Sequence, residues 1–141
     1  TTAAKALAWS WKKPLIPVHH IEAHAYAALM SADTWEFPYI TLIASGGHTS
    51  LFQSLSPTKH QMLGCTRDDA AGEALDKAAA MLGLGYPGGP AIQDAGSSGN
   101  PKAFAFKRPL LSPESLNFSF SGLKTALLYK LKGEISYLYS S

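Results

Sequence analysis

The chain has 141 residues, of which 46% are hydrophobic and 16% charged, and its formal net charge is +2 at pH 7. These values suit one soluble globular unit, and the mild positive charge permits contact with nucleic acid without arguing for it. The single cysteine, Cys65, excludes an internal disulfide, and no apolar run reaches the length of a transmembrane helix. Because the N-terminus also lacks a signal-peptide pattern, we expect a cytoplasmic protein.

The first 35 residues predict two helices joined by a short strand. Residues 2–11 have a helical pattern, and residues 15–18 are an apolar run next to prolines, which predicts a strand end or edge. Residues 21–30 are rich in Ala and contain neither Gly nor Pro, which favours a second helix. The candidate buried positions of the first helix are Ala6, Leu7 and Trp9.

Two histidines near the start of the second predicted helix suggest a metal site. His20 and His24 are four residues apart, which places them on one face of a helix. The same spacing also occurs on helices that bind no metal, and a complete site needs a further ligand, usually a carboxylate. Glu22 lies about 200° round the helix from His20 and points away, which disfavours a metalloprotease base there.

A glycine-rich turn follows the strongest predicted strand. Residues 37–44 and 51–55 predict two strands of a hairpin, with residues 61–63 as a possible third strand. The turn between the first two reads Ser45-Gly46-Gly47-His48-Thr49. It is either an ordinary hairpin turn or a backbone nest for a phosphate, and its polar residues favour the nest slightly.

Residues 67–82 predict the clearest helix. Thr66 with Asp69 three residues later is similar to a capping box, and Gly83 ends the pattern. Its apolar stripe consists of Ala71, Leu75, Ala78, Ala79 and Leu82. The carboxylates of Asp69, Glu73 and Asp76 would share the opposite face. That face is either solvated, with a Glu73–Lys77 pair, or it grips ribose hydroxyls or a metal-bound water.

The remaining stretches predict loops and one more helix. Residues 86–90, Tyr-Pro-Gly-Gly-Pro, form either a structural turn or a lid over a nucleotide, and residues 91–103 are predicted to be weakly structured. Residues 117–121 alternate apolar and polar side chains and are expected to be extended. Ser121 would cap a helix over residues 122–131, with Gly133 as its stop.

The start of that last helix has a second interpretation. It is rich in Ser and Gly and carries Lys124, so it could bind an anion. It does not match the phosphate-binding P-loop pattern, and a plain N-cap with a packed pair of phenylalanines is the favoured interpretation.

Taken in chain order, five stretches resemble one family, the universal tRNA threonylcarbamoyladenosine transferases, formerly called glycoproteases or O-sialoglycoprotein endopeptidases. The stretches are His19–His24, Ser45–Thr49, Asp68–Lys77, Tyr86–Pro90 and Asn117–Ala126. The Gly-His-Thr form of the second stretch resembles the bacterial and organellar branch.

The resemblance implies an α/β, actin-like ATPase fold, related to ribonuclease H, with two lobes and a ligand in the cleft. Residues 1–35 would end the first lobe and carry the histidine helix, and residues 36–141 would begin the second lobe with its nucleotide-binding loops. The implied reaction transfers a threonylcarbamoyl group from threonylcarbamoyl-AMP to N6 of the adenosine 3′ to the anticodon. The substrates are tRNAs that read codons beginning with A.

The resemblance also implies ligands and partners. His20 and His24 would hold one divalent metal ion, Fe(II) or else Zn or Mg. The adenylate would be cradled by Ile43, Ala44, Ser45, Gly46 and Gly47, and its ribose and adenine contacted by Asp76 and Gly89. Expected protein partners are a TsaB-like paralogue and a TsaE-like ATPase, without a membrane. No residue is identified as a catalytic general base.

Three family features have no counterpart in these residues: the first strand with its phosphate loop, a third metal ligand that is an Asp, and a later adenine-contacting Asn. The chain also begins without Met in a helical pattern. We therefore expect an internal fragment of a longer protein. Two alternatives to the transferase stay open, namely a metalloendopeptidase and a non-catalytic module that binds a nucleotide or a partner.

Overall fold

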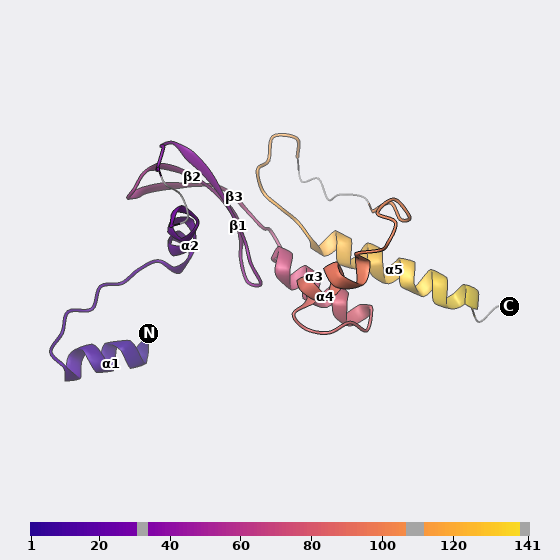
Figure 1. The fold of residues 1–141 in the computed structure, drawn as a ribbon, viewed down its shortest axis with the longest axis horizontal. Helices are drawn as coiled ribbons and strands as arrows, with labels where there is room; N and C mark the ends of the chain where they lie inside the picture. The colour runs from indigo at the N-terminus through magenta and orange to yellow at the C-terminus, as the bar shows by residue number, and fades with distance from the viewer. Residues whose placement is uncertain (31–33, 107–111, 139–141) are drawn as a thin grey trace. The chain divides into compact units, whose positions relative to one another are not determined.

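The computed structural model describes residues 1–30, 34–106 and 112–138 (Figure 1). They divide into two compact units, residues 1–35 and residues 36–141. The fold is mixed α/β with one small antiparallel sheet. Among the described residues, no helix is long and apolar enough to cross a membrane. The assignment of the two units to two lobes stays a prediction.

The first unit contains two helices, α1 (Thr2–Ser10) and α2 (His20–Leu29), as predicted. The predicted buried positions of α1 are wrong, because no residue of this helix is buried. Ala6 and Leu7 are exposed, and the side chain of Trp9 is 86% exposed. A helix buries its apolar side only against another element, and nothing covers this side of α1 among the described residues.

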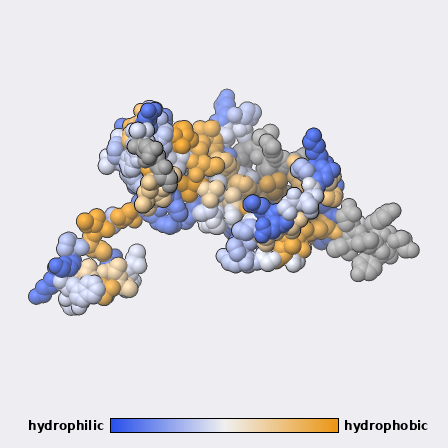
Figure 2. All heavy atoms as spheres, viewed as in Figure 1, coloured by the Kyte–Doolittle hydropathy of each residue, from blue (hydrophilic) through white to orange (hydrophobic). Residues whose placement is uncertain are grey.

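The segment that joins α1 to α2 forms no strand, so the strand predicted for residues 15–18 is wrong. Ile16 and Val18 are 79% and 75% exposed, and Figure 2 shows hydrophobic residues along this connection. A strand needs a neighbour with which to exchange hydrogen bonds, and Pro17 has no amide hydrogen to donate. Apolar composition alone therefore does not make this run a strand.

The second unit begins with a three-stranded antiparallel sheet in the order β1-β2-β3. The strands are β1 (Tyr39–Ala44), β2 (Thr49–Ser56) and β3 (Lys59–Cys65). The predicted hairpin is confirmed, since Ala44 pairs with Thr49 directly across the glycine turn. The third strand is also confirmed and is longer than residues 61–63. Ile43 and Phe52 are the buried apolar residues of this sheet.

Helix α3 (Ala71–Met81) begins later than predicted. The Thr66 hydroxyl donates to the carbonyl of Asp69 at 2.7 Å and closes a turn before the helix, so it is not the cap. The cap comes instead from Thr49 at the start of β2, whose Oγ1 accepts from the amide of Ala71 at 2.9 Å. The helix ends at the predicted place, since Gly83 follows with a φ of +69°.

Helix α4 (Gly88–Gly96) replaces the weak structure predicted for residues 91–103. Its start is held by Asp76 of α3, whose carboxylate accepts from the amide of Gly88. Helix α5 (Ser121–Leu138) continues past Gly133, so the predicted stop there is wrong. A glycine inside a helix costs about 1 kcal/mol, which neighbouring turns can outweigh.

Helices α3, α4 and α5 surround an apolar cavity of about 430 Å³. Its lining includes Leu75 from α3, Ile92 from α4 and Leu123 from α5. The predicted apolar stripe of α3 faces this cavity through Ala71, Leu75, Ala78 and Leu82. The stripe therefore belongs to the packing side of the helix, as its spacing indicates.

Candidate nucleotide and metal sites

The glycine turn is closed by Ser45. Its amide donates to the carbonyl of His48 at 2.8 Å, and its Oγ accepts from the amide of His48 at 3.1 Å. These bonds hold the turn as a tight hairpin connection. Ile43, which precedes it, is buried, whereas Ala44 is exposed.

The start of α3 packs directly against this turn. The amide of Gly72 donates to the carbonyl of Ser45 at 3.1 Å. A Cβ on residue 72 would lie 2.7 Å from that oxygen and from the Cα of Gly46. Only glycine permits this approach, which places the positive end of the α3 dipole beside the turn. The amides of Ala71 and Gly72 already have partners, so it is the helix dipole that favours an anion beside the turn.

Gly46 and Gly47 are exposed, and the space beside them is open. A Cβ built on either residue meets no atom within 4 Å, and among the described glycines only Gly83 has a positive φ. Neither crowding nor backbone conformation therefore demands glycine at these two positions. The missing side chains leave the backbone accessible, which is what close approach by a ligand requires.

Asp76 and Gly89 are brought together by the packing of α3 on α4. The Oδ1 of Asp76 accepts from the amide of Gly88 at 2.7 Å, and a Cβ on Gly88 would lie 2.5 Å from the Cα of Asp76. Gly89 follows, with a built Cβ 3.6 Å from the Leu75 side chain. One carboxylate oxygen of Asp76 thus orients α4, and the contacts with ribose and adenine stay predictions.

The two histidines of α2 converge. The Nε2 atoms of His20 and His24 are 3.3 Å apart, which is a hydrogen-bond distance between the two rings, and both residues are exposed. Two nitrogen ligands bound at about 2.0–2.1 Å to a tetrahedral metal lie about 3.3 Å apart, so the pair fits two positions of such a site. His19 does not join them, because its Nδ1 accepts from the amide of Glu22 (3.5 Å) at the helix start.

The described residues contain no group of three His, Cys, Asp or Glu side chains that could hold a metal ion. Within this part of the chain, the pair on α2 would therefore supply two ligands of a predicted site. Glu22 is exposed, and its predicted direction away from the pair stays a prediction.

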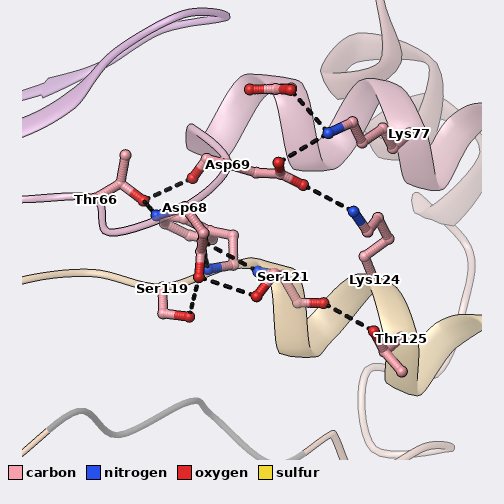
Figure 3. A network of polar contacts seen from close by, with 10 residues as sticks. Thr66, Asp68, Asp69, Lys77, Ser119, Ser121, Lys124 and Thr125 are labelled. Carbon is pink, nitrogen blue, oxygen red and sulfur yellow. Dashed lines mark hydrogen bonds and ion pairs between the residues drawn. The ribbon is translucent and has the colours of Figure 1, made fainter.

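The start of α5 already holds an anion, the carboxylate of Asp68 (Figure 3). The amides of Phe120 and Ser121 donate to its Oδ1 at 2.7 and 3.2 Å. The hydroxyls of Ser119 and Ser121 donate to its Oδ2. Desolvation raises the pKa of Asp68, but these four hydrogen bonds outweigh it and lower the pKa from 3.8 to about 2. Ser121 is thus the first helical residue and not the cap.

Asp69 links α3 to α5. Its carboxylate accepts from Lys77 Nζ at 2.8 Å and from Lys124 Nζ at 3.3 Å, and these contacts lower its pKa (Figure 3). The prediction that Asp69 shares a helical face with Glu73 and Asp76 is wrong, because Asp69 lies in the turn before α3. The predicted Glu73–Lys77 pair is confirmed at 2.8 Å.

Comparison with known proteins assigns the family. The family model described as TsaD, tRNA N6-adenosine threonylcarbamoyltransferase, matches residues 1–138. The chain belongs to the TsaD family. The resemblance seen in the five stretches is thereby confirmed.

Individual relatives of the TsaD family agree. The tRNA N6-adenosine threonylcarbamoyltransferase of Endomicrobium trichonymphae is 56% identical over 92% of this chain and 38% of its own length. The enzyme of the same name from Thermotoga neapolitana is 48% identical over 96% of the chain and 42% of its own length. The chain thus spans about two fifths of the length of these TsaD relatives.

Asp68 of this TsaD-family chain was missed as a functional candidate. Its hydrogen-bond partners lie 51–53 residues away in the sequence, so no local residue spacing predicts the contact. The anion predicted at the start of α5 is thus supplied from within the chain, and Lys124 is paired with Asp69.

Asp68→Asn should lower the free energy of unfolding by about 1 kcal/mol at pH 7, because the charged cap of α5 is lost. The folded-state pKa lies below the unfolded value, so the contribution is complete above pH 3.8 and disappears as the pH falls towards 2. Urea unfolding between pH 2 and 7 measures this. Asp94→Asn, on an exposed aspartate of α4, is the control. A difference between wild type and Asp68→Asn that does not change with pH would contradict the assignment.

His20→Ala or His24→Ala should weaken Zn²⁺ binding by at least about tenfold, because each removes a converging nitrogen. Glu22→Gln, on an exposed side chain of the same helix, is the matched control and should keep the wild-type affinity. Calorimetric titration of the full chain with Zn²⁺ measures the effect. Equal losses in all three variants would show that the α2 pair is not the binding site.

Proposed function

We propose that this chain carries the nucleotide-binding and part of the metal-binding machinery of threonylcarbamoyl transfer to tRNA. The substrates would be threonylcarbamoyl-AMP and the N6 amine of the adenosine 3′ to the anticodon. The observation that carries the proposal is the open glycine turn against the start of α3, in a chain that belongs to the TsaD family.

The proposal includes the wider architecture. The two units would be parts of an actin-like, two-lobed fold, with residues 1–35 in the first lobe and residues 36–141 in the second. The reaction would take place in the cytoplasm, with a TsaB-like paralogue and a TsaE-like ATPase as partners. Membership in the TsaD family supports each of these statements.

In the proposed reaction, the N6 amine attacks the carbamoyl carbon, the bond from that carbon to the phosphate oxygen breaks, and AMP leaves while N6 loses a proton. The glycine turn would bind the adenylate through its backbone, with Ile43, Ala44, Ser45, Gly46 and Gly47 as the contacting residues. The α3 dipole beside the turn favours the negative charge that the leaving phosphate carries. Asp76 and Gly89 would contact the ribose and adenine.

His20 and His24 would hold a divalent metal ion, Fe(II) in the first instance with Zn or Mg as alternatives. Such an ion supplies Lewis-acid polarisation of a carbonyl oxygen. The 3.3 Å separation of the two Nε2 atoms supports this role for the pair. No observation favours the metalloendopeptidase alternative.

Gly46→Ala should weaken AMP binding by about tenfold or more, because the methyl group occupies the space that the ligand approaches, while unfolding stays close to wild type. Gly96→Ala is the control, since its added Cβ also meets no atom within 4 Å. Calorimetry with AMP and urea unfolding of the full chain measure the two effects.

Equal AMP affinity in wild type and Gly46→Ala would contradict the nucleotide site. Transfer is scored in the same preparation by mass spectrometry of modified adenosine after incubation with threonylcarbamoyl-AMP and unmodified tRNA. AMP binding without modified adenosine would instead support the non-catalytic nucleotide-binding module.

A further inference from the structure

One side chain connects the start of α5 to the turn before α3. Asp68 accepts hydrogen bonds from Ser119 Oγ at 2.5 Å, Ser121 Oγ at 3.0 Å and the amides of Phe120 and Ser121 (Figure 3). Both carboxylate oxygens are thus engaged. The two sequence motifs Asp68–Lys77 and Asn117–Ala126 are therefore halves of one structural unit.

The backbone around Asp68 strengthens this connection. Thr66 and Phe118 form a parallel bridge, in which the amide of Phe118 donates to Cys65 and the amide of Arg67 donates to Phe118, at 3.1 and 2.9 Å. The Oδ1 of Asn117 accepts from the amide of Cys65 at 3.1 Å. The segment before α5 is thereby held beside the end of β3.

A short series of hydrogen bonds continues from this turn to the glycine turn. The amide of Thr66 donates to the carbonyl of Thr49 at 2.8 Å, and Thr49 Oγ1 caps Ala71 at 2.9 Å. The amide of Gly72 then donates to Ser45 at 3.1 Å. Thr49 is only 3% exposed, so water cannot readily replace its bonds.

We propose that Asp68 is a positioning residue for the glycine turn Ser45–Gly47, acting through the turn before α3 and the start of that helix. The carboxylate fixes the Thr66–Asp69 turn to α5. Thr49 bonds both Thr66 in that turn and Ala71 at the start of α3, and Gly72 bonds Ser45. Asp68 touches no ligand in this arrangement. The effect on nucleotide affinity rests on the proposed function, whereas the effect on the turn itself does not.

A positioning role and a simple capping role for Asp68 predict that different backbone amides open when the carboxylate is removed. If Asp68 only caps α5, its loss exposes the amides of Phe120 and Ser121, which donate to its carboxylate at the start of that helix. If it positions the glycine turn, the amides of Ala71 and Gly72 must open as well. Hydrogen exchange resolved by residue distinguishes the two, because it reports local opening.

The test compares the full chain with Asp68→Asn, Asp68→Glu and, as matched control, Asp94→Asn. In Asp68→Asn, exchange at Ala71 and Gly72 should become at least about threefold faster, and the Kd for AMP should rise between about twofold and thirtyfold. Asp68→Glu keeps the charge and should restore much of both. Asp94→Asn should match wild type. Ser119→Ala, which removes one of the four bonds, should give a smaller change of the same kind.

The exchange rates test the positioning role of Asp68, and the AMP affinity of the wild type tests the proposed nucleotide site. Faster exchange at Phe120 and Ser121 with unchanged exchange at Ala71 and Gly72 would overturn the inference, as would equal effects of Asp94→Asn and Asp68→Asn. Should wild type bind no AMP, the proposed nucleotide site fails, and the exchange at Ala71 and Gly72 still decides whether Asp68 positions the turn. If Asp68→Asn does not fold, Ser119→Ala provides the same exchange comparison.

Discussion

The contact between Gly72 and Ser45 is the constraint on which the second unit depends. A hydrogen bond of 3.1 Å joins the first turn of α3 to the glycine turn, and no side chain larger than hydrogen fits at residue 72 without displacing Ser45 or Gly46. The contact brings a helix dipole to an accessible backbone turn. The nucleotide-binding proposal follows from that geometry together with membership in the TsaD family.

Charged side chains within the chain maintain the surroundings of this contact. Asp68 neutralises the start of α5, Asp69 pairs with lysines of α3 and α5, and Asp76 holds the start of α4. Each of these carboxylates thus contacts a helix that lies later in the sequence than the carboxylate itself, and Asp69 joins two helices. The carboxylates of Asp68, Asp69 and Asp76 therefore hold α3, α4 and α5 together through hydrogen bonds and ion pairs.

The sequence pattern predicted correctly those features that depend on residues close together in the chain. The hairpin, helix α2 and the shared face of His20 and His24 follow from strand alternation, helix propensity and the four-residue spacing. The predicted start of α3 was wrong and helix α4 was not predicted, because the groups that hold their first amides, Thr49 and Asp76, are distant in sequence. Asp68 was missed for the same reason. The predicted burial of Trp9 and the predicted strand at residues 15–18 were wrong, because burial and strand pairing require a neighbouring element that composition does not specify.

The central claim is that the glycine turn binds the phosphate of an adenylate. A crystal structure of the chain with AMP tests this claim most directly. If the turn binds the adenylate, phosphate oxygens should lie within hydrogen-bond distance of the amides of Gly46 or Gly47, with Asp76 facing the ribose. AMP bound elsewhere, for example in the apolar cavity between α3, α4 and α5, with no contact to the turn, would contradict it.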